Sequence, residues 1–312
     1  MREQVWFFRL FIVFVIICVY RVLLQYVLKY RHCPNPFCSK CLGSGTMRER
    51  VIRILEGNDF NSYRVGETKE SKEEAERLNT LVLTNLLEHK RLLSKNIEKP
   101  TIYYHRGLSS TLYYIEHANL LKTYRDCAIL LDKYDMLRQE LIILLQQNNG
   151  KWKIDPINKR SLFYLYENGT ENELNCKLMP QTFELLQTLP NAIISNADCL
   201  FANVMITCLD PMILPSDTQE YGVTNCRIRC HLGLQCIAQD SDNKEVYIVA
   251  NKYKRLPLEN NHMVAYNDSA AHQYVNNTNY KQYILTVDLW HPDLSTSMRK
   301  HLAKVFHSRL ST

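Results

Sequence analysis

Apolar residues recur at helical spacing in two stretches of the first half of the chain. In residues 67–95 a charged opening is followed by leucines and a valine three and four positions apart, and Lys99-Pro100 comes just after the stretch. Residues 121–147 carry a second apolar stripe, which Asn148-Asn149-Gly150 ends with a strong stop signal. Because this spacing places apolar side chains on one face of a helix, we predict a helical region at 67–149 that packs on the rest of the protein.

After Gly150 the period of the pattern changes. Short runs of β-branched and aromatic residues alternate with turn residues, mostly without a helical pattern between them. The runs are SLFYLY, NVMITCL, CRIRCHLGL, KEVYIVA, HMVAY and YILTVDL. Strands at this spacing are typical of a sandwich or a barrel. We therefore predict a β domain over residues 150–312, and an α+β chain overall.

One predicted strand, residues 225–232, places ionisable groups on a single face. Alternation puts Asn225, Arg227, Arg229 and His231 on one face and Cys226, Ile228, Cys230 and Leu232 on the other. If the cationic face is enclosed, its charges need anionic partners nearby, whereas a solvated outer face is the ordinary alternative. Gly222 and Gly233 bracket the strand and indicate tight turns, which favours the enclosed face.

The N-terminus carries the most apolar segment of the chain. The uninterrupted run at 10–20 is too short to cross a bilayer, which needs about 20 residues, but continuing to Leu28 reaches that length. Arg21 then lies near the end of the span, where its side chain can reach the interface. A cleaved signal peptide and a buried helix are the alternatives. Because no small-residue cleavage site follows the apolar run, we predict an uncleaved signal anchor at 1–30.

The orientation of this anchor depends on weaker signals. The basic residues on its two sides are balanced, so the positive-inside rule gives no clear answer. Three N-glycosylation sequons favour a lumenal C-terminal part, and they begin at Asn168, Asn267 and Asn276. We therefore predict a single-pass type II membrane protein of the endoplasmic reticulum or Golgi.

Charge and cysteine content add two further expectations. The net charge of +6 comes from scattered lysines and arginines, so we predict no nucleic-acid partner. Three of the 11 cysteines, Cys33, Cys38 and Cys41, cluster beside His32 in a predicted stalk at 31–66. They could be zinc ligands, but one local disulfide with a spare thiol is the interpretation that we favour for a lumenal protein.

Residues 222–234, GVTNCRIRCHLGL, and the later segment VDLWHPDLS resemble signature motifs of the aspartyl/asparaginyl β-hydroxylase domain family. The similarity extends through FYLYENG, Leu189-Pro190, CLDP, the Tyr266-Asn267-Asp268-Ser269 segment and His272, and it covers about residues 150–305. The cysteine cluster and EKPTIYYHRGL also resemble the membrane-proximal part of single-span family members. The resemblance implies a double-stranded β-helix (jelly-roll or cupin-like) domain.

The resemblance also implies an activity and a set of site residues. Active members of this family hold Fe(II) with two histidines, and they use 2-oxoglutarate and O2 to hydroxylate Asp or Asn side chains of lumenal protein domains. His272 matches the second iron-binding histidine. Arg229 and His231 match the pair that receives one carboxylate of 2-oxoglutarate, and Thr207 stands where a serine binds this co-substrate.

Three positions depart from the family pattern. Glu220 stands where the first iron-binding histidine is expected, two residues before Gly222. Gln282 stands where an arginine would bind the far carboxylate of 2-oxoglutarate, six residues before Asp288. A tryptophan expected before the FYL segment is replaced by Arg160 or Ser161, depending on the alignment.

Two functions follow from these observations. The first is an active Fe(II)- and 2-oxoglutarate-dependent hydroxylase in which Glu220 and His272 bind iron, assisted by Asp217. The second is a non-enzymatic relative whose barrel, with a carboxylate pocket at Arg227, Arg229 and His231, binds a protein partner or an acidic peptide. A purely structural membrane protein, the third possibility, would not need the cationic strand face.

Overall fold

The computed structural model of the chain describes residues 48–56 apart from 50 and 54, and residues 69–307 apart from 94–96, 110–112, 115–119, 121–123, 148–149, 196–197, 216–218 and 237–244. The chain divides into two compact units, residues 1–49 and 50–312, and every element below belongs to the second. The predicted anchor at 1–30 and the cluster Cys33, Cys38 and Cys41 lie outside the described residues. No helix within the described ranges combines the length and the apolar character that crossing a membrane requires.

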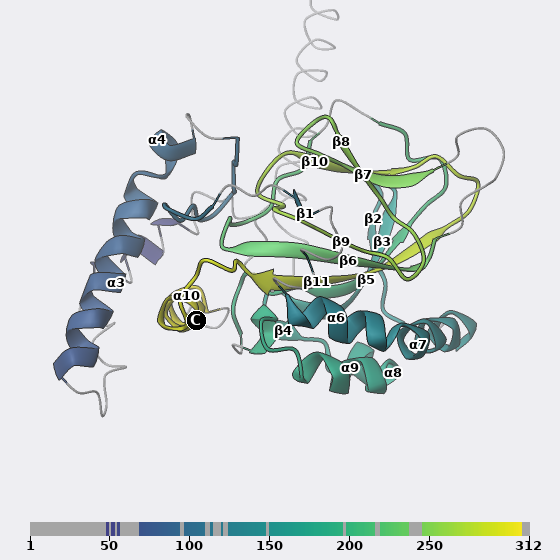
Figure 1. The fold of residues 1–312 in the computed structure, drawn as a ribbon, viewed down its shortest axis with the longest axis horizontal. Helices are drawn as coiled ribbons and strands as arrows, with labels where there is room; N and C mark the ends of the chain where they lie inside the picture. Colours follow the sequence, from purple (N-terminus) through teal and green to yellow (C-terminus); the bar gives the residue numbers. More distant parts are fainter. Residues whose placement is uncertain are drawn as a thin grey trace, which may run out of the picture. The chain divides into compact units, whose positions relative to one another are not determined.

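Two antiparallel sheets form the centre of the second unit (Figure 1). The larger sheet has the strand order β1-β9-β6-β11-β5-β3-β2, with β4 paired to β3. Its strands are β1 (Tyr113–Tyr114), β2 (Lys153–Asp155), β3 (Arg160–Glu167), β4 (Thr170–Glu171), β5 (Val204–Leu209), β6 (Arg227–Gln235), β9 (Met263–Tyr266) and β11 (Gln282–Trp290). The smaller sheet has the order β10-β7-β8, with β7 (Val246–Ala250), β8 (Lys254–Pro257) and β10 (His272–Asn276). Such a pair of facing antiparallel sheets is a jelly-roll-like barrel.

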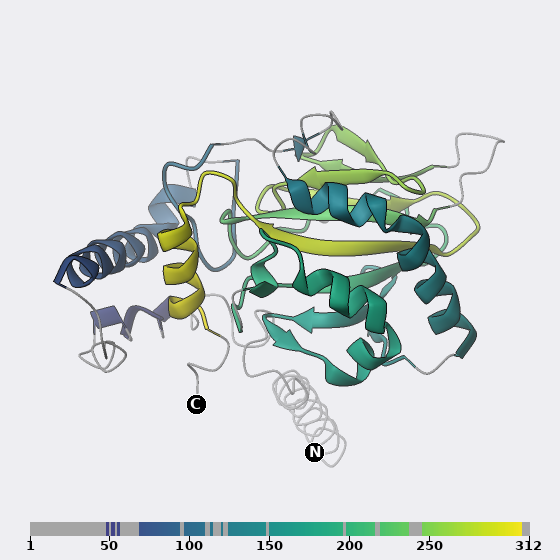
Figure 2. The same ribbon diagram turned by 60° about the horizontal axis from the view of Figure 1, so that its bottom comes forward.

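Helices cover the side of the large sheet that faces away from the small sheet (Figures 1 and 2). The described helices are α3 (Lys69–Leu87), α4 (His89–Leu93), α6 (Arg125–Asp132), α7 (Tyr134–Gln147), α8 (Glu173–Leu178), α9 (Pro180–Gln187), the 3-10 helix η2 (Ile193–Ser195) and α10 (Thr296–Val305). Side chains of α6, α7, α8 and α9 pack on the sheet, whereas α3 lies against α10.

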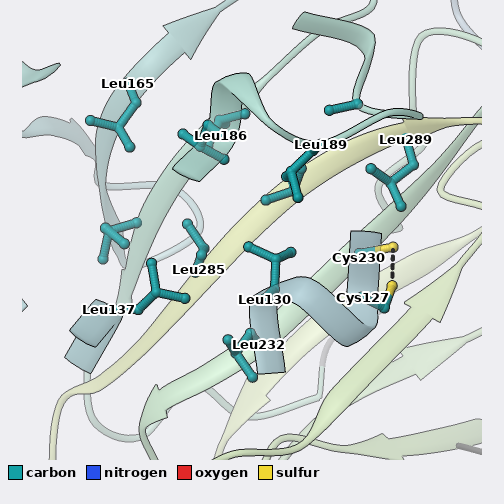
Figure 3. Close-up of a cluster of buried hydrophobic side chains, with 14 of the residues drawn as sticks. Cys127, Leu130, Leu137, Leu165, Leu186, Leu189, Cys230, Leu232, Leu285 and Leu289 are labelled. Carbon is teal, nitrogen blue, oxygen red and sulfur yellow. Dashed lines mark hydrogen bonds between the residues drawn. The ribbon is translucent and has the colours of Figure 1, made fainter. Parts of the chain in front are cut away.

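Strand alternation divides the large sheet into an outer and an inner face. On the outer face, Ile228, Cys230 and Leu232 of β6 pack among leucines of the helices in the main hydrophobic core (Figure 3). The Sγ atoms of Cys127 in α6 and Cys230 lie 3.8 Å apart in this core, and both cysteines are free. A second core, between the sheets, contains Leu209, Ile248, Val264, Tyr266, Tyr274 and Ile284. The fold therefore encloses the inner face.

The predicted strands are confirmed, while the helical predictions need corrections. All six apolar runs after residue 150 form strands of the two sheets. The stretch 121–147 contains two helices rather than one, with a break at Lys133, and 67–95 likewise contains α3 and α4. The expectation of few helices after residue 150 overlooked α8 and α9. Asn172 caps the first of these by accepting a bond from the Asn175 N–H, and Pro180 begins the second.

The glycines at the two ends of the signature strand are required for different reasons. A Cβ at Gly222 would overlap the carboxylate of Asp268, which explains the glycine at that end. Gly233 lies inside β6 rather than in a turn, and a Cβ there would overlap the backbone carbonyl of Glu259. The prediction of a tight turn at Gly233 is therefore wrong; the glycine permits close backbone approach instead.

Candidate functional site

The inner face of β6 carries the predicted row of ionisable groups. Cross-strand pairing sets Arg229 opposite Asp288 and His231 opposite Thr286, so these side chains share the barrel interior. Arg227 and His231 are buried, and Arg229 is nearly so. The sequence predicted that such a face, if enclosed, would need anionic partners. Asp268 and Asp288, both buried, are those partners.

Four buried charges form one ion-pair network. The guanidinium of Arg227 contacts Asp268, with Nη2 2.6 Å from Oδ2, and Nη1 lies 3.0 Å from Oδ2 of Asp288. Arg229 donates from Nε to Asp288 Oδ1 at 2.8 Å and from Nη2 to Oδ2 at 3.0 Å, while its Nη1 is 3.2 Å from Asp268 Oδ2. Burial alone would raise the pKa of Asp268, but the two guanidinium groups outweigh it and hold that pKa well below its usual range.

This network changes the interpretation of the predicted carboxylate pocket. The forked donors of Arg229, which match a co-substrate-binding arginine, already bind a carboxylate of the protein in a bidentate pair. Arg227 donates its remaining bonds to Asp268 and to the carbonyl of Phe201. In this structure the two arginines of the predicted ligand pocket, Arg227 and Arg229, are bound by side chains and a carbonyl of the chain itself.

His231 is fully hydrogen-bonded inside the barrel. Its Nδ1 lies 2.9 Å from Thr286 Oγ1, and its Nε2 lies 3.2 Å from the hydroxyls of both Tyr266 and Tyr274. Burial, together with the nearby charge of Arg229, lowers the pKa of His231 well below its ordinary value. His231 is therefore a neutral imidazole at physiological pH, and both of its ring nitrogens have partners.

His272 opens β10 and pairs through its backbone with Glu220. The two residues exchange both backbone bonds, at 2.9 and 3.0 Å, so their side chains leave the same side of the pair. The Nδ1 of His272 lies 3.0 Å from the carbonyl oxygen of Ala270, which selects the tautomer with a lone pair on Nε2. Burial lowers the pKa of His272, and Glu220 and Asp268 offset only part of that shift. His272 is therefore a neutral imidazole whose Nε2 carries the lone pair that metal binding requires.

Glu220, in contrast, is already engaged by a cation. Its Oε2 accepts a bond of 2.7 Å from Nη2 of Arg160, whose guanidinium carbon also lies 5.3 Å from the ring centre of Tyr274. Nη2 of Arg160 is in addition 3.3 Å from Oδ2 of Asp155. Burial would lower the pKa of Arg160, but Glu220 and the other partners raise it above its ordinary value. Glu220, one of the departures from the family pattern, therefore contacts Arg160, one of the two residues that align with the expected tryptophan.

The other two predicted co-substrate residues, Gln282 and Thr207, are also buried. Gln282 is buried and donates from Nε2 to Thr278 Oγ1 at 2.7 Å. Thr207 lies opposite Leu162 of β3 and Ile284 of β11 on the inner face. Its buried Oγ1 has no hydrogen-bond partner among the described residues, a condition that a bound polar ligand or water would relieve.

A cavity of about 280 Å³ opens beside the ion pair. The turn before β3, the segment after β5 and strand β10 form its walls, and Glu220 and Tyr274 line it. Three apolar side chains at its lining are solvent-exposed: Ile157 (80%), Leu214 (54%) and Met212 (44%). Asp217, proposed as an assisting ligand, lies outside the described residues.

These residues do not fit an Fe(II) centre. Within the described ranges, no three His, Cys, Asp or Glu side chains come together as metal ligands. The two candidates supply one imidazole and one carboxylate, and the guanidinium of Arg160 occupies that carboxylate. A divalent cation there would meet a like charge at hydrogen-bond distance from Glu220, one of its two candidate ligands among the described residues.

Two of the three predicted glycosylation sites lie in buried turns of the fold. Asn267 and Asn276 are buried, and their Oδ1 atoms accept bonds from the hydroxyl and backbone N–H two residues later in the sequon. The Nδ2 of Asn267 donates to Glu98, and that of Asn276 donates to the carbonyls of Asp210 and Tyr280. These sequons are structural Asx turns. Asn168 alone is partly exposed, in a turn with φ of 50°.

Sequence reasoning missed several residues that complete the site. Tyr266 and Tyr274 hold His231, Asp155 supports Arg160, and Asp268 balances two arginines. Alternation along β10 could have placed Tyr274 on the same face as His272. The contact between Arg160 and Glu220 joins positions 60 residues apart, so no local pattern could have predicted it.

The jelly-roll barrel encloses His272, His231 and Arg229, the three residues that the resemblance assigns to the iron and co-substrate sites. Over residues 132–292, just over half of the chain, the sequence matches the family described as aspartyl/asparaginyl beta-hydroxylase. The chain therefore belongs to the aspartyl/asparaginyl β-hydroxylase family. The match begins before residue 150, so it includes helix α7 as well as the strands.

Curated relatives carry the same family name. Aspartate beta-hydroxylase domain-containing protein 2 of Homo sapiens is 24% identical over 286 residues, which are 89% of this chain and 71% of the relative. The protein of that name from Xenopus tropicalis is 27% identical over 219 residues, and the match covers 68% of this chain and just 55% of the relative. The human aspartyl/asparaginyl beta-hydroxylase is 26% identical over 179 residues, 55% of this chain and 22% of that protein.

Solved structures show more distant similarity. A prolyl hydroxylase from Trichoplax adhaerens, in complex with a hypoxia inducible factor peptide fragment, matches 60% of this chain and 96% of its own, with 10% identity and a TM-score of 0.32. A prolyl-4-hydroxylase from Pseudomonas putida matches 53% of this chain and 98% of its own, with 9% identity and a TM-score of 0.30.

Proposed function

We propose that this chain is a non-catalytic member of its family that binds a protein partner at the mouth of the barrel. The observation that carries the proposal is the ion pair between Arg160 and Glu220, which stands where the family pattern has an iron-binding histidine. The pair is largely enclosed, since the side chains are 12% and 27% exposed. Removing one partner of a buried ion pair lowers the free energy of unfolding by roughly 3–5 kcal/mol. A metal that separated Glu220 from Arg160 would have to offset much of this energy.

The co-substrate side of the site supports the same proposal. Arg229 is bound by two aspartates, His231 has partners at both nitrogens, and Gln282 brings no charge. A dicarboxylate entering this interior would have to displace carboxylates of the chain itself. The barrel therefore keeps the family fold without an open, positively charged receptor for 2-oxoglutarate.

The mouth of the barrel has the character of a binding surface. Exposed Ile157, Met212 and Leu214 line a cavity together with the polar groups of Glu220 and Tyr274. Clustered exposed apolar side chains on a soluble domain mark contact sites more often than isolated ones do. This chemistry fits a protein segment that inserts an apolar side chain and makes hydrogen bonds to Glu220 and Tyr274.

Two observations favour a second candidate, an active Asp/Asn hydroxylase. His272 has the tautomer of a metal ligand, and the hydroxyl of Thr207 is unpartnered in the interior. In that case Glu220 and His272 would hold Fe(II), which with 2-oxoglutarate supplies the oxidising chemistry that hydroxylates a lumenal Asp or Asn side chain.

Calorimetry separates the two candidates. The detergent-solubilised full chain is titrated with Mn(II) as a redox-stable probe, and then with 2-oxoglutarate, beside the His272→Ala variant. We expect no saturable Mn(II) binding and no Mn(II)-dependent binding of 2-oxoglutarate. Saturable binding of both that is lost in His272→Ala would overturn the non-catalytic proposal and establish the hydroxylase site.

The membrane setting is part of the proposal. An anchor at 1–30 would place residues 50–312 beside a membrane, and Asn168, partly exposed, is consistent with a lumenal side. Protease protection of the C-terminal part in sealed microsomes tests this arrangement. Digestion without detergent would place the domain on the cytosolic side instead.

A further inference from the structure

We infer that Cys127 of α6 and Cys230 of β6 form a disulfide bond when the chain folds in the presence of a disulfide oxidant. The bond ties the helix to the strand that carries Arg229 and His231 on its other face. The inference is independent of the proposed function, because it requires neither a bound partner nor a metal. It adds a covalent modification site in the core that supports the barrel.

The two sulfur atoms already lie in contact. Their Sγ atoms are 3.8 Å apart, and Figure 3 shows them pointing toward each other between the helix and the strand. The sulfur–sulfur distance of a disulfide is about 2.0 Å, so closing the bond brings the two atoms together by roughly 1.8 Å. Among the described residues, no other two cysteine sulfur atoms come within hydrogen-bonding distance of each other.

The elements around the two cysteines hold them in this arrangement. Cys230 lies inside the large sheet, paired with Val287 of β11 on one side and with Ala265 of β9 on the other. The start of α6 is fixed by Asp126, whose carboxylate accepts two bonds of 2.8 Å from the backbone and side-chain amides of Asn191. The fold therefore brings together two thiols that are 103 positions apart in the sequence.

The reaction is a thiol–disulfide exchange with an oxidant such as oxidised glutathione or a protein disulfide oxidoreductase. The thiolate of one cysteine attacks a sulfur atom of the oxidant, forms a mixed disulfide and releases one oxidant thiolate. The thiolate of the second cysteine then attacks the sulfur atom of the first, closes the protein disulfide and releases the other oxidant thiolate. The two protein thiols lose two electrons and two protons, and the oxidant disulfide is reduced to two thiols.

Burial decides when this exchange takes place. Cys127 is 0% exposed and Cys230 is 1% exposed, so an oxidant does not reach either sulfur atom in the folded core. The contact with Cys127 and burial also raise the pKa of the Cys230 thiol well above its ordinary value, which suppresses the reactive thiolate. The bond therefore forms while α6 docks on β6 during folding, and the finished core shields it from reductants.

The test uses the full chain in detergent, which is reduced and unfolded in urea, freed of reductant and refolded by dilution into a mixture of reduced and oxidised glutathione. Remaining thiols are blocked with N-ethylmaleimide, and tryptic peptides are analysed by mass spectrometry without reduction. Cys127 lies on the tryptic peptide DCAILLDK, and Cys230 lies on CHLGLQCIAQDSDNK, which also contains Cys236. Fragmentation of the linked peptides identifies which of these sulfur atoms is bonded.

Two variants are compared with the unaltered protein. Cys127→Ala removes one of the two thiols. Cys176→Ala is the matched control, because Cys176 is also a buried free cysteine, but its Sγ lies 3.5 Å from the carbonyl oxygen of Leu165 rather than beside another thiol.

We expect the refolded unaltered protein and Cys176→Ala to contain the peptide that links Cys127 to Cys230, whereas in Cys127→Ala the thiol of Cys230 is modified by N-ethylmaleimide. The bond should also lower the equilibrium constant of unfolding in urea by roughly tenfold or more, relative to the same protein refolded with a reductant. Cys127→Ala should show no such difference between the two conditions, because it cannot form the bond.

Refolded unaltered protein with a native circular dichroism spectrum but without the linked peptide overturns the inference, and so does a Cys230 that is bonded to Cys236 instead. If Cys127→Ala does not fold, Cys127→Ser is measured, and the peptide of the unaltered protein still decides. If refolding from urea fails, the chain is synthesised in a cell-free extract with the same glutathione mixture and detergent, and the same peptide decides. None of these results involves metal or partner binding, so the inference can fail while the proposed function stands.

Discussion

At the scale of single residues, the barrel interior depends on a balance of two positive and two negative charges. Asp288 contacts both Arg227 and Arg229 and also accepts a bond from Asn203 at 3.2 Å. None of its side chain is exposed. The sequence predicted that Arg227 and Arg229 would need anionic partners, yet it could not say which of the many acidic residues would supply them. Strand pairing places Asp288 opposite Arg229, and only the fold brings Asp268 to the same point.

We expect Asp288→Asn to destabilise the protein by roughly 3–5 kcal/mol, because it leaves two buried guanidinium groups with one carboxylate. Urea unfolding followed by circular dichroism measures this change. Glu245→Gln is the control, since Glu245 is 58% exposed and 3.9 Å from Arg255, and its effect should stay below about 1 kcal/mol. Equal effects of the two substitutions would contradict the importance of the network.

Several buried histidines make stability depend on pH. Burial lowers the pKa of His105 and of His301 to about 4, from an ordinary value of 6.5. Between these values the unfolded chain binds protons that the folded protein does not bind, so stability must fall as pH falls through this window. For each such histidine, the free energy of unfolding decreases by about 1.4 kcal/mol for every unit by which the pH falls in this window.

We therefore expect the urea midpoint to decrease between about pH 6.5 and about pH 4, and to decrease less in His301→Gln, which removes one of these titrating groups. The contribution of His301 is given by how steeply the urea midpoint changes with pH in the two proteins, rather than by the midpoints themselves. An identical pH dependence in the variant and the unaltered protein would show that His301 is not protonated on unfolding in this range.

At the scale of elements, alternation predicted the strands of the large sheet well because one face of that sheet packs against helices and the other faces the barrel. The helices were harder to place. Helices α8 and α9 have six and eight residues, too few for a clear apolar period, and a long-range contact holds the second one. The carboxylate of Glu140, in α7, accepts bonds from the backbone N–H groups of Gln181 and Thr182 at 2.9 and 2.7 Å. It caps α9 from another helix, which no local sequence pattern reveals.

We expect Glu140→Gln to destabilise the protein by about 1–3 kcal/mol, because a neutral amide cannot accept from both N–H groups and from the Thr182 hydroxyl. Glu184→Gln, at an exposed position of α9, should change stability by less than about 0.5 kcal/mol. Chemical denaturation of both variants checks the difference, and a neutral Glu140→Gln would exclude the cap as a stabilising contact.

At the scale of the whole molecule, the sequence identified the family and the barrel, whereas it could not establish the state of the site. The motif at 222–234 places Arg229 and His231 correctly, but motifs do not show that Asp288, Thr286 and two tyrosines already bind them. The same limit applies to the sequons. Asn267 and Asn276 match the pattern of glycan acceptors, and the fold uses both as buried turn residues.

We expect any N-linked glycan on the folded chain to be carried by Asn168. In cells, a glycosidase-sensitive mobility shift should disappear in Asn168→Gln and should not depend on a glycan at Asn267 or Asn276. A shift that persists in Asn168→Gln would show that one of the buried sequons is modified before the chain folds. The absence of any shift in the unaltered chain would count against the lumenal arrangement.

The edges of the three-stranded sheet restrict how the protein meets other chains. Backbone bridges from Ile213 and Glu220 cover the outer side of β10 at two points. At the opposite edge, β8 presents Lys254, Arg255 and Pro257, residues that discourage the addition of another strand. This sheet is therefore protected against intermolecular β-sheet growth. A partner that docks on this side of the barrel must be recognised through side chains, and we expect the folded domain to resist fibrillar self-association even at high concentration.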